Sequence, residues 1–142
     1  MTDTDSRAQI LLEKLMEVQV AFHSSNQDKA RELGLSVAQA TVALDLAGHP
    51  GSNLHEVCGR LGWPKSSVSR LVDELVRKGL ATRTIPEDNR RAVLLSVAPE
   101  VRSHCLEGAA AAFFPGAKGS LSQEDAASIG TALDRMLALM KP

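Results

Sequence analysis

The sequence has little of several features that define common protein classes. Aromatic residues make up 3% of its 142 residues, tyrosine is absent, and there are two cysteines. No uninterrupted apolar run approaches the roughly 20 residues that a membrane-spanning helix needs. The first residues, up to Arg7, are polar and acidic, unlike a secretion signal. We therefore expect a cytoplasmic protein with no membrane partner.

Signatures of catalysis and of metal binding are also missing. The chain has no glycine-rich phosphate loop, no His-Glu-x-x-His pair and no nucleophile elbow, so we expect no enzyme activity. Cys58 and Cys105 are 47 positions apart, a spacing that matches no zinc site. Two thiols are also too few for a disulfide framework. The sequence thus predicts reduced, buried thiols, and it predicts no catalytic residue, metal site or cofactor.

What is present is an ordinary globular composition with an uneven charge. Apolar residues make up 44% and charged residues 23%, and the length suits one compact domain. The net charge is −1, but residues 54–102 contain nine Lys or Arg against six acids, which leaves +3 there and −4 elsewhere. Because affinity for phosphate depends on where charge lies, a basic middle segment between acidic ends is compatible with binding nucleic acid.

Apolar spacing predicts an amphipathic helix near the N-terminus. Leu11, Leu15, Val18 and Phe22 follow one another at helical steps, which indicates a helix over about residues 6–23. A polar connector over residues 24–28 and a brief segment ending at Gly34 are expected to follow. The stripe is wider than one small core needs, which suggests burial against a second surface.

Three later helix starts are marked by a side chain that can cap free backbone N–H groups, with a residue three positions on that can reach back. These pairs are Ser36 with Gln39, Asn53 with Glu56, and Ser122 with Asp125. The expected helices end at Gly48 and at Gly62, and the third runs over residues 123–140. Its apolar positions are Ile129, Leu133, Met136, Leu137 and Met140.

A further helix is expected from Pro64, placed in its first turn, to Lys78. Trp63 and Val68 stand at the two positions of a hydrophobic staple. After Gly79 the apolar period changes to about two over residues 80–85 and 92–97, with turn residues between them. This indicates a β-hairpin, followed by a helix from Pro99 to about residue 114 with Val101, Cys105, Leu106, Ala109, Ala112 and Phe113 available for burial.

This order of elements predicts a mainly α fold with a small β-hairpin, namely a winged helix-turn-helix with N- and C-terminal dimerisation helices. We expect three parts within one compact domain: residues 1–34 and 99–142 for dimerisation and residues 35–98 for DNA binding. The candidate contacts in the major groove are the small and basic residues near the start of the longer helix: Lys65, Ser66, Ser67, Ser69 and Arg70. The alternative is that they form only a solvated face.

The expected turn of the hairpin holds a second set of candidates, Asp88, Arg90 and Arg91. A guanidinium on a protruding turn can enter the narrow, electronegative minor groove, and a neighbouring carboxylate can orient it. The alternative here is an ordinary charged turn.

Residues 35–102 resemble the multiple-antibiotic-resistance regulator (MarR) family. The matching pieces are "LSVAQATVALDLAGHPG", "LHEVCGRLGWPKSSVSRLVDELVRKGLATR" and "PEDNRRAVLLSVAPE", and the most specific is the Asp-x-Arg at Asp88 and Arg90. The resemblance implies that residues 65–70 contact the major groove and that Arg90 enters the minor groove, with Asp88 orienting it. Two departures are the loss of the hydroxyl cap before Pro99, where Ala98 stands, and Pro64 in place of a frequent serine.

The resemblance also implies partners and regulation. It implies a homodimer, built from the terminal helices, on a pseudo-palindromic operator in double-stranded DNA. A small phenolic or carboxylate ligand, bound between the dimerisation and DNA-binding parts, is expected to release the DNA. The function that follows is a sequence-specific transcriptional regulator, most simply a repressor. Packing of the terminal helices within one chain is the alternative to dimerisation.

Other specialised roles are weighed against this expectation. Redox-sensing relatives use a reactive cysteine assisted by tyrosines, and tyrosine is absent here. The four histidines and two cysteines include no pair with the tight spacing of a zinc site. The main rival function is a winged-helix module that binds protein and not DNA, which would need neither Arg90 nor the basic segment.

Overall fold

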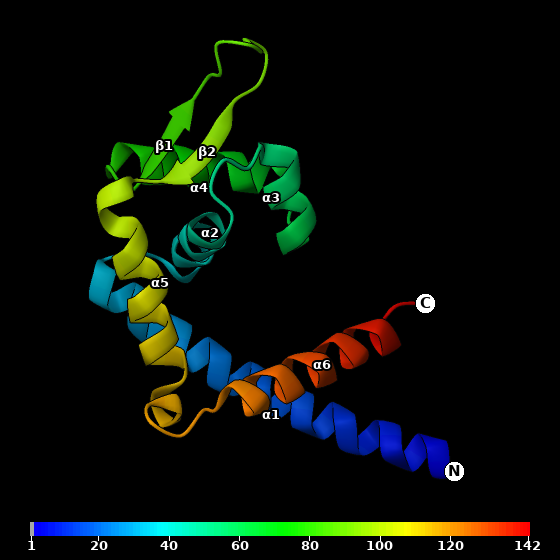
Figure 1. Cartoon of the computed structure of the whole chain (residues 1–142). Coiled ribbons are helices and arrows are strands. Elements are labelled where there is room, and N and C mark those ends of the chain that lie inside the picture. The colour runs from blue at the N-terminus through cyan, green and yellow to red at the C-terminus, as the bar shows by residue number, and fades with distance from the viewer. Residues whose placement is uncertain (1) are drawn as a thin grey trace.

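The computed structural model describes residues 2–142, so Met1, the first residue of the predicted N-terminal segment, lies outside the described part. The elements are α1 (Asp3–Leu33), α2 (Val37–Gly48), α3 (Leu54–Leu61), α4 (Lys65–Arg77), β1 (Ala81–Thr84), β2 (Leu94–Val97), α5 (Pro99–Phe113), the 3-10 helix η1 (Pro115–Ala117) and α6 (Gln123–Met140). The two strands form an antiparallel hairpin at one end of a helical molecule (Figure 1). The predicted mainly α fold with a small β-hairpin is therefore confirmed.

The first helix is much longer than the sequence predicted. It starts after Thr2, whose hydroxyl accepts a hydrogen bond from the Asp5 N–H while the Asp5 carboxylate accepts one from the Thr2 N–H. The predicted connector at residues 24–28 was wrong, because this segment continues α1. It contains no glycine or proline, and Asn26 within it is buried, donating a hydrogen bond from Nδ2 to Thr41 Oγ1 at 2.9 Å. Polar side chains there mark a contact with α2.

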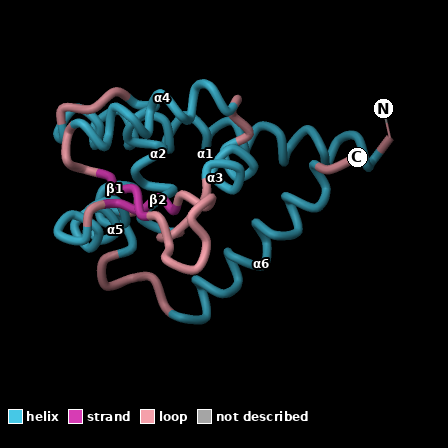
Figure 2. The backbone as a smooth tube through the Cα atoms, turned by 90° about the horizontal axis from the view of Figure 1, so that it is seen from above, coloured by secondary structure: helices cyan, strands magenta, loops and turns pink. Residues whose placement is uncertain are grey.

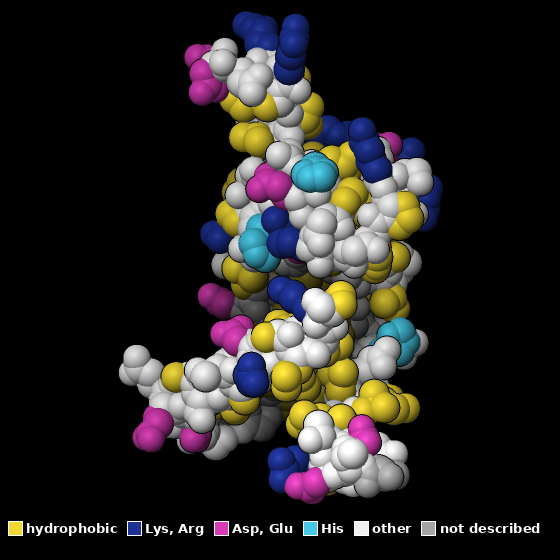
Figure 3. Space-filling model, turned by 90° about the vertical axis from the view of Figure 1, so that its right-hand side faces the viewer, with side chains coloured by type: hydrophobic (Ala, Val, Ile, Leu, Met, Phe, Trp, Pro, Cys, Tyr) yellow, Lys and Arg dark blue, Asp and Glu magenta, His cyan; other side chains and the backbone are white. Residues whose placement is uncertain are grey.

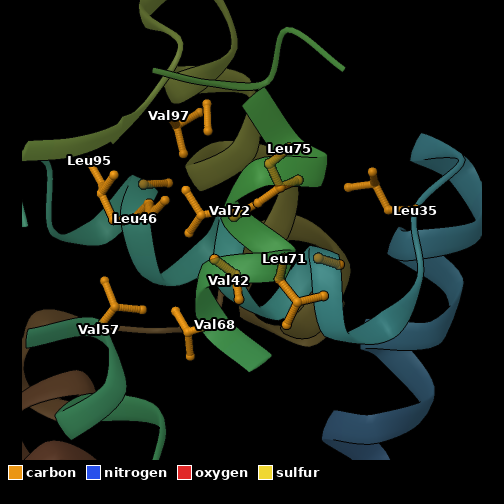
Figure 4. Packing of buried hydrophobic residues seen from close by; sticks show 14 of the residues in the cluster. Leu35, Val42, Leu46, Val57, Val68, Leu71, Val72, Leu75, Leu95 and Val97 are labelled. Carbon is orange, nitrogen blue, oxygen red and sulfur yellow. The ribbon is translucent and has the colours of Figure 1, made fainter. Parts of the chain in front are cut away.

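The core lies where α2, α3, α4 and the hairpin meet. Figure 4 shows Val42 and Leu46 of α2, Val57 of α3, and Val68 and Val72 of α4 gathered around one interior, with Leu95 of β2 above them. The largest fully buried side chains are Leu46, Leu75, Val42, Val57, Val68 and Val72. Every one lies between residues 42 and 75, so α2, α3 and α4 bury their apolar faces against one another.

The hairpin is anchored at its base. Ala81 pairs with Val97 and Thr84 with Leu94, so the paired part is four residues long on each strand. Ser52, from the segment between α2 and α3, adds an antiparallel bridge to Leu95, with backbone N···O distances of 3.1 and 2.7 Å. The hairpin therefore projects from a fixed base in the core.

The C-terminal helices are less buried than the sequence suggested. α5 begins at Pro99 after Ala98, which makes no side-chain cap, as the departure from the family pattern predicted. Of the positions expected to be available for burial on α5, Ala109 is buried and Ala112 is exposed, because α5 contacts α1 and α2 along one side only. α6 has no buried residue, and it extends toward the same side of the molecule as the start of α1 (Figures 1 and 2).

None of the helices in residues 2–142 is long and apolar enough to cross a membrane.

Candidate nucleic-acid interface

A tight turn joins α3 to α4. α3 ends at Leu61 and is capped by Gly62, which has φ 67°, a left-handed conformation that favours glycine. The Gly62 N–H donates to the Cys58 carbonyl at 2.8 Å. Pro64 then has an extended ψ of 147° and serves as the N-cap, so α4 starts at Lys65. The expectation that Pro64 lies within the first turn was wrong by one position. With Pro64 as the N-cap, Trp63 and Val68 occupy the two staple positions, and Trp63 packs against the core.

The two faces of α4 differ sharply. Val68, Leu71, Val72 and Leu75 are buried in the core. Of the five candidates on this helix, Lys65, Ser66 and Arg70 are exposed, and Ser67 and Ser69 are half-buried at the edge. Since the apolar stripe fixes the rotation of the helix, the polar N-terminal residues are turned toward solvent.

Arg70 is held by a partner that the sequence interpretation missed. Its Nη1 donates to Glu74 Oε1 at 2.9 Å, and the other carboxylate oxygen of Glu74 accepts from Gln39 Nε2 of α2 at 2.7 Å. The hydrogen bond from Gln39, followed by the hydrogen bond and the charge of Arg70, lowers the pKa of Glu74 below its usual value. The Arg70–Glu74 spacing of four residues could have indicated the pair, whereas Gln39 is too distant in sequence to give a local signal.

The wing candidates lie at the far end of the hairpin. Asp88, Arg90 and Arg91 are all exposed, and Lys and Arg side chains gather at the tip beside acidic ones (Figure 3). Asn89 shapes this turn: its N–H donates to the Pro86 carbonyl at 3.3 Å, and its Oδ1 accepts from the Arg91 N–H at 3.3 Å. Within residues 2–142, no ion pair or side-chain hydrogen bond joins Asp88 to Arg90. In the free chain both charges face solvent.

Other cations of the basic segment are used to hold the fold. Arg83 of β1 forms an ion pair with Asp73 of α4, and Lys78 Nζ donates to the Gly34 carbonyl at 3.1 Å. Arg102 Nε donates to the Ala47 carbonyl at 3.3 Å. Across the described chain, Lys65, Arg90 and Arg91 make neither a side-chain hydrogen bond nor an ion pair. Free cations of this segment therefore lie at the start of α4 and at the wing tip.

A nearly buried ion pair fixes the elements beneath this surface. Arg60 donates from Nε and Nη2 to the two Asp45 carboxylate oxygens at 2.9 and 2.8 Å, and from Nη2 to Ser52 Oγ at 2.7 Å. The Asp45 side chain is 8% exposed. The hydrogen bonds that Arg60 donates to Asp45 raise the pKa of Arg60, so this guanidinium stays charged. Because Ser52 also bridges to β2, the network joins α2, α3 and the base of the hairpin.

The cysteines and histidines lie apart from this surface. Both thiols are free and half-buried, and burial raises the pKa of Cys105. All four histidines are exposed. Within residues 2–142, His, Cys, Asp and Glu side chains nowhere gather in a group of three that could hold a metal ion.

This arrangement is that of a winged-helix protein: a helix-turn-helix formed by α3 and α4, with an anchored hairpin as the wing. The MarR family model matches residues 33–92, which span α2 to the end of the wing loop. Across these residues the chain is similar to the MarR family, and its winged-helix architecture agrees with that match. No curated protein sequence matches the chain.

Solved structures of similar fold cover nearly the whole chain. The regulator BldR from Sulfolobus solfataricus superimposes with a TM-score of 0.70 at 20% identity, covering 99% of this chain and 100% of that one. A MarR transcriptional regulator from Methanosarcina mazei Go1 gives 0.70 at 16% identity, with 92% and 95% covered. Wild-type MarR from E. coli in its apo form gives 0.65 at 18% identity, with 89% and 96% covered. At such identities these matches establish the fold, including the terminal helices.

Proposed function

We propose that this protein is a dimeric transcriptional regulator that binds double-stranded DNA through α4 and the wing. The observation that carries the proposal is the placement of solvent-facing cations on both elements. Lys65 and Arg70 lie on the free face of α4, and Arg90 and Arg91 lie at the tip of a hairpin anchored beside it. A helix in the major groove and a cationic turn in the adjacent minor groove need these two exposed sets.

Dimerisation is supported by the apolar surface of the terminal helices. Leu11, Val18 and Phe22 of α1, and Leu133 and Leu137 of α6, are between 45% and 56% exposed. Hydrophobic side chains gather between two projecting arms at the end of the molecule opposite the wing (Figure 3). A second copy is the partner that covers such a surface on both chains at once, and its two-fold symmetry matches a pseudo-palindromic operator.

A ligand that controls release could enter the molecule at a small cavity between α1, α2 and α5. Its lining includes Leu33, Leu44 and Phe113, together with Lys29 and Cys105. The cavity is about 20 Å³, enough for roughly one water molecule. A phenolic or carboxylate compound would therefore have to separate α1 from α5. Since α2 contacts both helices and also α4, this movement would be passed to the DNA-binding helix.

Two arginine variants test DNA binding. We expect Arg70→Ala to relax base preference at one position in each half-site, costing about 1 to 3 kcal/mol if Arg70 contacts guanine bidentately. Arg90→Ala should weaken operator and random duplex alike and reduce the salt slope by about one unit. Asp88→Ala should give a milder form of the Arg90 loss, because Arg90 would remain but lack a neighbouring carboxylate that could orient it once DNA is bound. Lys118→Ala, an exposed cation outside the helix-turn-helix, is the control.

The readout is titration of duplexes at several salt concentrations, after selection of bound sequences from random DNA. Wild-type affinity of Arg90→Ala on every duplex would remove the wing from the mechanism and favour a protein-binding module. Sedimentation tests the dimer, and a monomer mass at micromolar concentration would contradict it. A panel of phenolic and carboxylate compounds that leaves operator affinity unchanged would contradict ligand control.

A further inference from the structure

We propose that Glu74 is a positioning residue for base recognition: it holds Arg70 in one orientation, and Gln39 of α2 holds Glu74 in turn. This inference rests on the proposed DNA-binding function and assigns roles to two residues that need not touch DNA. It makes sequence selectivity depend on the N-terminal turn of α2 as well as on α4.

The geometry is a continuous chain of hydrogen bonds. Gln39 and Ser36 form the reciprocal cap of α2, with the Ser36 N–H donating to Gln39 Oε1 at 3.0 Å and the Gln39 N–H donating to Ser36 Oγ at 3.1 Å. The Gln39 amide then donates from Nε2 to Glu74 Oε2, and Glu74 Oε1 accepts from Arg70 Nη1. Every polar atom of the Gln39 side chain is therefore in use, which fixes its orientation and that of the carboxylate beyond it.

The contact leaves the recognition edge of Arg70 free. A guanidinium has five N–H donors in a planar fork, and a bidentate contact with guanine needs two neighbouring donors. Nη1 of Arg70 is bound to Glu74, while Nε and Nη2 bond to nothing within residues 2–142. Glu74 thus restrains the side chain from one side without occupying the Nε–Nη2 edge that can contact a base.

Burial and charge distinguish this pair from an ordinary surface ion pair. The Glu74 side chain is 23% exposed, whereas that of Arg70 is 64% exposed, so the carboxylate is the fixed partner and the arginine the projecting one. Glu74 is ionised at neutral pH, and the hydrogen bonds from Gln39 and Arg70 lower its pKa further below that range. A fixed negative charge on a DNA-facing helix also opposes binding to arbitrary phosphates, which raises selectivity at the expense of random binding.

The test compares discrimination with affinity. Two duplexes are titrated, the selected operator and the same operator changed at the base pair that Arg70→Ala identifies. A bidentate arginine–guanine contact discriminates by about 5- to 150-fold. We expect Glu74→Ala to reduce the discrimination ratio at that base pair by about fivefold or more, and to raise affinity for random duplex. Gln39→Ala should reduce the ratio less, because Glu74 keeps its bond to Arg70.

A double-mutant cycle shows whether Glu74 acts through Arg70. In an Arg70→Ala background, Glu74→Ala should change the ratio no further. Glu107→Ala removes the same charge from the exposed side of α5 and should leave the ratio unchanged. A merely structural role of Glu74 would lower thermal stability while leaving the ratio intact.

The outcomes separate this inference from the proposed function. Wild-type protein without any sequence preference would overturn both. Wild-type selectivity that Glu74→Ala leaves unaltered would overturn the positioning role alone. The same would follow if Glu74→Ala reduced the ratio equally with Arg70 present or absent.

Discussion

The winged-helix body, residues 35–98, and the terminal arms, formed by the first half of α1 and by α6, bury their apolar side chains very differently. In the body Leu46, Val57 and Leu75 are fully buried within the chain. In the arms Leu11, Leu12, Leu133 and Leu137 are about half exposed, and α6 has no buried residue. Both regions have helical apolar stripes, so amphipathicity alone does not show where the covering surface comes from.

This difference shows that the body buries its apolar side chains within one chain, whereas the arms leave theirs exposed. α2, α3 and α4 pack on one another and on the hairpin, whereas α6 packs on no element of its own chain as closely as these do. The stability of the body should therefore be a property of one chain. That of the arms should depend on protein concentration.

The largest expected effect comes from matched leucine truncations in the two regions. Leu75→Ala should lower the free energy of unfolding by about 2 to 5 kcal/mol, because it leaves a cavity in a packed core. Leu137→Ala should change it by only about 0.5 kcal/mol at low protein concentration, since the side chain is exposed there. Urea unfolding at two concentrations is the measurement. Equal losses for both variants at low concentration would show that α6 packs within its own chain.

Alanine substitutions of one arginine in the body and one in the arms should differ less in their cost to stability than the two leucine variants. Arg60→Ala should cost about 2 kcal/mol, because it leaves the nearly buried Asp45 carboxylate without its charged partner. Arg7→Ala breaks an exposed pair with Asp3 on α1 and should cost about 0.5 kcal/mol or less. Thermal unfolding of both variants decides this. A loss for Arg7→Ala as large as that for Arg60→Ala would mean that the start of α1 is covered in solution.

Alanine substitutions at two glycines near the end of α3 should change the stability of the protein in opposite directions. Gly62→Ala should destabilise the body by about 1 to 2 kcal/mol, because a φ of 67° is unfavourable for alanine. Gly59→Ala lies inside α3 with open space around it, and it should stabilise by about 0.5 to 1 kcal/mol. Melting temperatures report both changes. A stabilising Gly62→Ala would contradict the left-handed turn before α4.

The smallest effect concerns pH. Because the pKa of Glu74 is lowered in the folded chain, its contribution to stability is present above its ordinary pKa of 4.5 and is lost as the pH falls through the folded value. The difference in stability between wild type and Glu74→Ala should therefore be constant near neutral pH and shrink below about pH 4. Unfolding curves between pH 3 and pH 7 measure it. A difference that grows on acidification would contradict an ionised Glu74 in the body.

Much of the helix-turn-helix could be predicted from local sequence. The caps at Ser36 and Asn53 and the glycine at Gly62 place α2 and α3 within a residue of their positions, because caps and left-handed glycines act over three or four residues. The candidate site residues on α4 could be chosen because its apolar face defines the opposite, solvent-facing side. Whether each of them contacts DNA stays a prediction.

The features that the sequence predicted wrongly, or did not predict, depend on contacts between residues that are distant along the chain. Residues 24–28 were expected to be a connector because they are polar. The polar side chain of Asn26 instead forms a hydrogen bond with Thr41 of the next helix. Gln39 could be recognised as a cap of α2, but nothing local indicates that its amide also holds Glu74, 35 positions away. Ala112 was expected to be available for burial from its helical step, and it is exposed because α5 is covered on one side only.

By itself the sequence determined where α2, α3 and α6 begin, where the hairpin turns, and which helix faces are apolar, since these depend on propensities and spacings within a few residues. Only the tertiary structure decided which apolar faces find a partner within the chain, which of the cations remain free, and that Arg70 is restrained through α2. These depend on which distant segments meet. Burial and hydrogen bonding are properties of pairs of surfaces, and a single segment does not specify its partner.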